Sequence, residues 1–94
     1  MKEIMICGIP YKIVPTEDVF DVDTHLGQIN YITGEIRVNK RLQGEILYET
    51  LAHEIIHGIL MYLGYEKESQ DEQFVQALGN AINQTFTIKG MENE

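Results

Sequence analysis

The first forty residues alternate between apolar and polar side chains in short runs that turn-forming residues interrupt. Residues 3–7 and 11–15 are rich in β-branched side chains and flank a Gly-Ile-Pro break, which is typical of a β-hairpin. Residues 29–38 alternate more regularly around a Thr-Gly turn and predict a second hairpin. The acidic stretch at residues 16–24 has no clear period, so we expect a loop there.

Beyond residue 44 the apolar positions change to the period of an α-helix. Leucine and isoleucine recur at four-residue intervals, which predicts a long, largely buried helix over residues 45–63 that Gly64 terminates. A second helix is predicted over residues 69–86, followed by a frayed tail from about residue 89. The order of elements predicts an α+β fold, with a small antiparallel or mixed sheet followed by two helices, in a single domain over residues 1–94.

Composition narrows the partners that we expect. Seven basic against fifteen acidic residues give a net charge of -8, which opposes attraction to phosphate backbones and anionic lipid. We therefore expect no nucleic-acid partner and no membrane partner, and the sequence sets no oligomeric state. Cys7 is the only cysteine, which excludes an intrachain disulfide and fits a reducing compartment. The longest apolar stretch, residues 55–63, is too short to span a bilayer, so we expect a cytoplasmic protein.

The first predicted helix carries two histidines four residues apart, His53 and His57, with Glu54 between them. Residues at this spacing project from one helix face, so two imidazoles can converge on one ion. Imidazole is a good zinc ligand, and a catalytic zinc has three protein ligands and an open position for water. Glu54 points about 100° round the helix from His53, where it can take a proton from that water. We therefore predict a Zn²⁺ site with two histidine ligands and Glu54 as the general base.

The stretch TLAHEIIHGI resembles the extended HExxH signature of zincin metallopeptidases. Its position after a β-segment is similar to that in very small gluzincin-like proteins of bacteria and phages, related to the ImmA/IrrE group. In that group the helix after the signature brings a glutamate as the third zinc ligand. The glutamate is followed by apolar residues three and six positions later, and Glu72, Val75 and Leu78 are similar to this pattern. The resemblance therefore implies Glu72 as the third ligand and a minimal zincin-like core.

Three other interpretations of the third ligand remain open. Asp71 points closer than Glu72 to the centre of the apolar side of the second helix. Residues 69–72 also have the form of a capping box, in which Ser69 caps the helix and Glu72 bonds back to its backbone. His25 lies in the expected loop and is a further candidate ligand. His25 or Tyr65 could alternatively donate a hydrogen bond to the transition state.

A second resemblance points to a different chemistry. The stretch HGILMYLGYE is similar to the signature H-G-x-L-H-L-x-G-Y-D-H of the rRNA-maturation endoribonucleases, whose three histidines bind zinc. In that register His57 is the first ligand, but Met61 and Lys67 occupy the other two positions. Neither side chain replaces a neutral imidazole on zinc, and the acidic charge opposes an RNA substrate. The sequence therefore disfavours this register.

The function that these residues predict is that of a zinc metallopeptidase. Zinc would lower the pKa of a bound water and polarise the scissile carbonyl, while Glu54 would pass the water's proton to the leaving amine. The ImmA/IrrE resemblance implies a peptide or protein substrate, such as a regulatory protein of a phage or its host. The substrate could pair with residues 35–38 if they form a sheet edge. The alternative is a zinc-binding regulatory or interaction module that cleaves nothing, because zinc also stabilises small folds.

Overall fold

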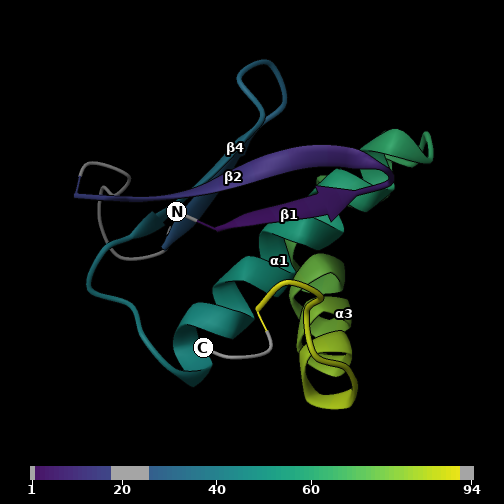
Figure 1. Ribbon diagram of the computed structural model, residues 1–94. Helices are drawn as coiled ribbons and strands as arrows, with labels where there is room; N and C mark the ends of the chain where they lie inside the picture. The colour runs from purple at the N-terminus through teal and green to yellow at the C-terminus, as the bar shows by residue number, and fades with distance from the viewer. Residues whose placement is uncertain (1, 18–25, 92–94) are drawn as a thin grey trace.

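The computed structural model describes residues 2–17 and 26–91 and shows a four-stranded sheet followed by three helices (Figure 1). This arrangement confirms the predicted α+β fold with a mixed sheet. The elements are β1 (Glu3–Ile6), β2 (Ile9–Thr16), β3 (Gly27–Asn30), β4 (Glu35–Asn39), α1 (Glu45–Tyr62), α2 (Glu66–Ser69) and α3 (Glu72–Thr85).

Both predicted hairpins form, and a parallel pairing joins them. β1 pairs with β2 and β3 with β4 in antiparallel fashion, whereas β2 and β4 run parallel, with Ile13 opposite Ile36. The resulting order is β1-β2-β4-β3. The expectation that residues 35–38 form a sheet edge is wrong, because β4 lies between two strands and both of its sides are paired.

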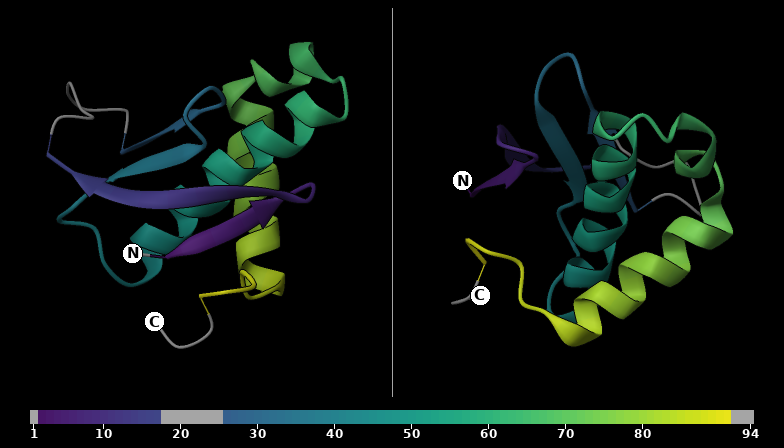
Figure 2. Two further views of the ribbon diagram at one scale, coloured as in Figure 1. Left: turned by 45° about the horizontal axis from the view of Figure 1, so that its top comes forward. Right: turned by 90° about the vertical axis from the view of Figure 1, so that its right-hand side faces the viewer.

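α1 lies between the sheet and α3, as the right-hand view of Figure 2 shows. One core lies between α1 and the sheet, where alternate residues of β1, β2 and β4 are buried, as their period of two requires. A second, smaller core lies between α1 and α3. α1 therefore buries two faces, which explains why the sequence around its histidines is apolar on several sides. The two cores contain Ile4, Ile6, Tyr11, Ile13, Ile36, Val38, Leu51 and Met91, and Ile56, Leu60 and Val75, respectively.

The helix boundaries agree with the sequence at α1 and differ at α3. α1 ends at Tyr62, and Gly64 has a φ of 88°, the left-handed conformation expected of a helix-terminating glycine. The second helix, predicted over residues 69–86, begins only at Glu72 as α3. The short helix α2 precedes it and ends at Ser69. Asp71 caps α3, since its carboxylate accepts a hydrogen bond of 3.1 Å from the backbone N–H of Phe74.

The end of the described chain returns to the sheet. Met91 is only 4% exposed and belongs to the core beside the strands, so the expected fraying does not hold at this position. A Cβ built on Gly90 would lie 3.4 Å from the carbonyl oxygen of Glu3, which places this segment against β1. Residues 92–94 lie outside the described residues. Among the described helices, none has the length and apolar character needed to cross a membrane.

Candidate metal centre

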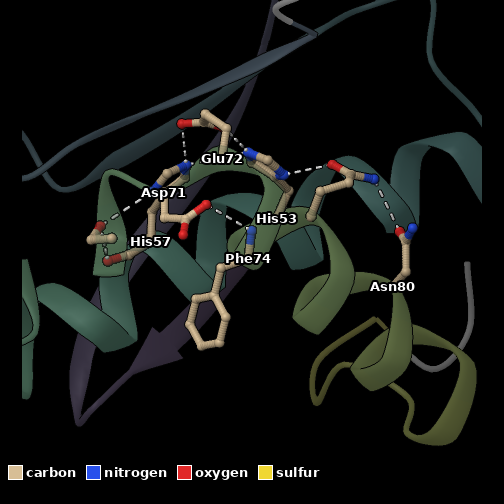
Figure 3. A network of polar contacts seen from close by, with 8 residues as sticks. His53, His57, Asp71, Glu72, Phe74 and Asn80 are labelled. Carbon is tan, nitrogen blue, oxygen red and sulfur yellow. Dashed lines mark hydrogen bonds and ion pairs between the residues drawn. The ribbon is translucent and has the colours of Figure 1, made fainter. Parts of the chain in front are cut away.

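Three side chains from two helices converge beside the α1–α3 contact (Figure 3). His53 and His57 lie one turn apart on α1, and their Nε2 atoms are 3.2 Å apart. Glu72, the first residue of α3, places Oε1 2.9 Å from Nε2 of His53 and Oε2 3.3 Å from Nε2 of His57. One potential ligand atom from each residue lies within 4.8 Å of the other two. The three residues form a cluster that could hold a metal ion.

The spacing of these atoms fits a small tetrahedral cation. Ligands about 2.0–2.1 Å from a tetrahedral zinc are about 3.3 Å from one another. The two Nε2 atoms are 3.2 Å apart, and each lies 2.9 or 3.3 Å from a different oxygen of the Glu72 carboxylate, distances close to that value. Two imidazoles and one carboxylate are also a common ligand set for catalytic zinc, with the fourth position left open. Both the spacing and the chemistry of the three residues therefore fit zinc.

The hydrogen bonds of His53 set its tautomer. Its Nδ1 lies 2.7 Å from Oε1 of Gln76, an oxygen that can only accept. The orientation of the Gln76 carboxamide is set in turn, because its Nε2 donates to Oδ1 of Asn80 at 3.1 Å. His53 therefore donates from Nδ1, which leaves the lone pair of Nε2 directed at the cluster. Such a bond to the second ring nitrogen is typical of metal-binding histidines.

Ser69 sets the tautomer of His57 in the same way. The Ser69 hydroxyl donates to the backbone carbonyl of His57 at 3.2 Å, and the same oxygen lies 3.2 Å from Nδ1 of His57. Because the hydroxyl proton is used, this oxygen accepts from Nδ1–H. The lone pair of Nε2 on His57 therefore also points at the cluster. Desolvation lowers the pKa of His57, as expected for an imidazole that favours its neutral form, although the charge of Glu72 opposes this shift.

In their neutral forms, the two imidazoles bring no positive charge to balance the carboxylate of Glu72. Two imidazole lone pairs and the carboxylate of Glu72 meet at distances of 2.9–3.3 Å. Acceptor atoms this close repel one another unless a proton or a cation lies between them. The arrangement is therefore matched to a bound cation.

Glu54 lies beside the cluster on α1 and is 7% exposed. Burial raises the pKa of Glu54 to about 7, and the negative charge of Glu72 adds to this effect. A carboxyl group with this pKa can both accept and release a proton near neutral pH. Its environment is therefore suited to the general-base role predicted for it.

A cleft of about 550 Å³ opens beside His53 and Glu54. Gly27, at the start of β3, forms part of its wall and packs closely against α1. A Cβ at this position would lie 2.8 Å from Cγ2 of Thr50 and 3.4 Å from Cγ of Glu54. The close approach of β3 to α1 thus depends on glycine. The cleft is lined by Leu26, Gly27, Ile46, Glu49, Thr50, His53, Glu54, Glu72, Gln73 and Gln76.

Three tyrosines connect the centre to the sheet. Burial raises the pKa of Tyr31, the charge of Glu54 adds to this effect, and an interaction with the Ser69 side chain opposes it. The rings of Tyr31 and Tyr62 pack edge to face with centroids 6.3 Å apart, and those of Tyr62 and Tyr11 do so at 6.5 Å. The hydroxyls of Tyr11 and Tyr62 also hydrogen-bond to each other. Through Ser69, the aromatic row ends one side chain away from His57.

The structure brings His53, Glu54, His57 and Glu72 together, and it separates the other candidates from them. Asp71 caps α3 and is not part of the cluster. The capping-box interpretation of Glu72 is wrong, because Ser69 ends α2 and uses its hydroxyl on His57. Tyr65 is 54% exposed at the start of α2, and His25 lies outside the described residues. Sequence reasoning missed three supporting residues, Ser69 as a partner of histidine, Gln76 and Tyr31, whose roles depend on contacts between different elements.

Comparison with known proteins identifies a similarity to an endoribonuclease. The chain is 34% identical over 70 residues to Endoribonuclease YbeY of Bartonella bacilliformis. The match covers 73% of this chain and 44% of the relative, so the chain spans less than half of that protein's length. No family model matches the chain, and no solved structure matches it. A relationship to the ImmA/IrrE group is not shown by these comparisons.

This similarity contradicts the expectation of a peptide substrate and no nucleic-acid partner. The net charge of -8 is a sum over the whole chain, and it opposes only nonspecific attraction to phosphate. The net charge of the whole chain does not give the charge of one local site. The structure does not assemble the three positions of the endoribonuclease-like register, His57, Met61 and Lys67, because the cluster consists of His53, His57 and Glu72.

Proposed function

We propose that this protein is a zinc-dependent hydrolase that cleaves RNA internally. The observation that carries the proposal is the convergence of two imidazole lone pairs and the Glu72 carboxylate beside the buried Glu54. The similarity to an endoribonuclease supports RNA as the substrate class. In this proposal His53, His57 and Glu72 hold the metal, and Glu54 transfers the proton.

When bound, zinc supplies Lewis-acid chemistry that activates water and stabilises negative charge on the phosphate. Glu54 accepts the proton of the attacking water as the new oxygen–phosphorus bond forms. Glu54 then gives this proton to the leaving oxygen of the ribose as the old phosphorus–oxygen bond breaks, so the Glu54 carboxylate is regenerated. A pKa of about 7 in the metal-free protein allows Glu54 to make both transfers near neutral pH. A nearby cation lowers this pKa and so favours the ionised carboxylate, which is the form that accepts a proton in the first step.

The supporting side chains keep the histidines ready for the metal. Gln76 and Ser69 accept from the Nδ1–H groups of His53 and His57 and so hold both rings with Nε2 directed at the cluster. Preorganised ligands of this kind lose little entropy when the metal binds. The cleft beside His53 gives a substrate access to the same point.

The test combines metal analysis with cleavage of an end-labelled RNA. We expect about one zinc per chain and RNA cleavage in the wild type. Glu54→Gln should keep its zinc and lose cleavage by about 100-fold or more, as expected when a general base is removed. Glu72→Ala should lose zinc affinity and cleavage together. Glu66→Gln, which removes an exposed glutamate of α2, is the charge-matched control and should behave as the wild type.

Two results would overturn the proposal in different ways. A wild-type protein without stoichiometric zinc would exclude the metal centre. Zinc binding with no cleavage by the wild type would instead favour the alternative of a non-catalytic zinc module. Equal cleavage in Glu54→Gln would show that Glu54 is not the general base. A structural observation is consistent with that alternative, because the metal would join α1 to α3 through His53 and Glu72.

A further inference from the structure

Glu49 lies one helical turn before His53 and lines the same cleft. Residues four apart on a helix face the same side, with Cβ atoms about 5–6 Å apart. The Glu49 carboxylate forms no hydrogen bond or ion pair with the described residues, although it is only partly exposed. The cleft therefore contains an acceptor group without a partner next to the metal centre.

The described residues that line the cleft offer acceptor groups and apolar surface. None of the described residues that line it is a lysine or an arginine. Glu49 and Gln73 instead present a carboxylate and a carboxamide, and the Gln73 side chain also has no partner among the described residues. Leu26 and Ile46 add apolar surface. The combination of apolar walls and acceptor groups suits a flat ring that carries N–H donors.

We propose that this cleft binds a guanine base of the RNA substrate, with Glu49 as the specificity-determining residue. This inference rests on the proposed function, because it assumes that RNA is the substrate. Guanine is the base whose Watson–Crick edge offers two adjacent donors, N1–H and the N2 amino group, and a carboxylate can accept both at once. The Gln73 carboxamide can donate to O6 of the same edge. Adenine and cytosine each offer an amino group next to an acceptor, which a carboxylate repels.

The position of Glu49 relative to His53 supports this assignment. A base held at Glu49 lies one helical turn from the histidine ligand, and a ribose can bridge the gap to a phosphate at the centre. The cleft volume of about 550 Å³ accommodates a purine nucleotide. Because none of the described lining residues is a lysine or an arginine, we expect base contacts and the metal to provide most of the binding free energy.

The first experiment measures nucleotide binding to the zinc-loaded protein by calorimetry. GMP, IMP and AMP share a ribose and a phosphate and differ only at the base edge, and IMP lacks only the N2 amino group. We expect GMP to bind about 10-fold tighter than IMP or AMP, the size of discrimination that a bidentate contact gives. Glu49→Gln and Glu49→Ala should lose this preference, whereas the control Glu66→Gln should keep it. Equal binding of the three nucleotides, or an unchanged preference in the Glu49 variants, would overturn the inference.

The second experiment maps cleavage in oligouridine RNAs that contain one guanine or one adenine. We expect cuts beside the guanine in the wild type and loss of this preference in Glu49→Ala. Cleavage without base preference would overturn the inference and leave the proposed function intact. A guanine preference in binding without any RNA cleavage would overturn the proposed function and retain the binding site.

Discussion

Gly79 of α3 packs directly against the backbone of His53 on α1. A Cβ built at Gly79 would lie 3.3 Å from both Cα and N of His53, and these are backbone atoms that cannot rotate away. The two helices thus approach most closely where the first histidine is located. The same contact sets the distance between His53 and Glu72, which begins α3 two turns earlier.

We predict that Gly79→Ala separates the two helices and weakens the metal centre. Overpacking of this kind costs about 1–3 kcal/mol, which exceeds the gain of up to about 1 kcal/mol in helix propensity. The free energy of unfolding should fall, and zinc affinity should fall with it because Glu72 moves away from His53. Urea denaturation in the presence of chelator and zinc titration measure the two effects. Ala77→Gly, at an exposed position of α3, is the control, because it changes helix propensity without changing the helix contact.

Replacement of Asp71 should lower stability and keep zinc binding, whereas replacement of Glu72 should weaken zinc binding and keep most of the stability. Asp71→Ala removes the cap of α3 and should lower the free energy of unfolding by about 1 kcal/mol, with one zinc still bound per chain. Glu72→Ala should bind zinc much more weakly and lose little metal-free stability, because its side chain is 67% exposed. Metal content after dialysis, measured beside thermal unfolding in chelator, separates the two residues. Loss of zinc in Asp71→Ala but not in Glu72→Ala would reverse the assignment.

Removal of the Ser69 hydroxyl should weaken zinc binding although Ser69 is not a ligand. Ser69→Ala deletes the acceptor that holds Nδ1–H of His57, and the loss of such a partner typically lowers metal affinity 10–100-fold. A competition titration with a zinc indicator measures the change. Unfolding in chelator reports any purely structural effect of the substitution. Wild-type zinc affinity in Ser69→Ala would show that this hydrogen bond does not orient the ligand.

The raised pKa of Glu54 predicts a pH dependence of stability in the metal-free protein. The group has a pKa of about 7 when folded and an ordinary value of 4.5, so the folded state holds the proton more tightly. Stability from this source is fully present below pH 4.5 and is lost as the pH rises through 7. The free energy of unfolding should fall by about 3 kcal/mol as Glu54 ionises. Urea denaturation at pH 5 and pH 8 should show this decrease in the wild type, and Glu54→Gln should lack that part of it.

Local patterns in the sequence were sufficient for most of the elements and for bringing His53 and His57 to one helix face. The period of two along residues 29–38 and the four-residue spacing of α1 reflect one-sided burial within a single segment. His53 and His57 could be paired for the same reason, because their separation is fixed by the helix itself. The sheet order could not be predicted in this way. Nothing in the pattern of β4 showed that β2 would pair with it in parallel and occupy the edge proposed for a substrate.

The rest of the centre depends on contacts between segments. Glu72 was implied by the family resemblance, whereas helical position alone placed Asp71 closer to the centre of the apolar side. In the structure the Asp71 carboxylate caps α3, and Glu72 faces the histidines. Ser69 and Gln76 had no distinguishing signal, because their roles depend on where α2 and α3 pack against α1. The net charge was misleading for a related reason, since a sum over the chain contains no information about one cleft.

The row formed by Tyr11, Tyr62 and Tyr31 also gives the protein its own optical signal. The sequence contains no tryptophan, so tyrosine emission is not masked by a stronger fluorophore. The edge-to-face rings, with centroids 6.3 and 6.5 Å apart, are close enough to exchange excitation energy. Because the Ser69 side chain interacts with Tyr31 and contacts Nδ1 of His57, we expect a rearrangement at His57 to affect the end of the row. We therefore expect metal uptake to change the intrinsic tyrosine fluorescence, which can be measured without a label attached to the chain.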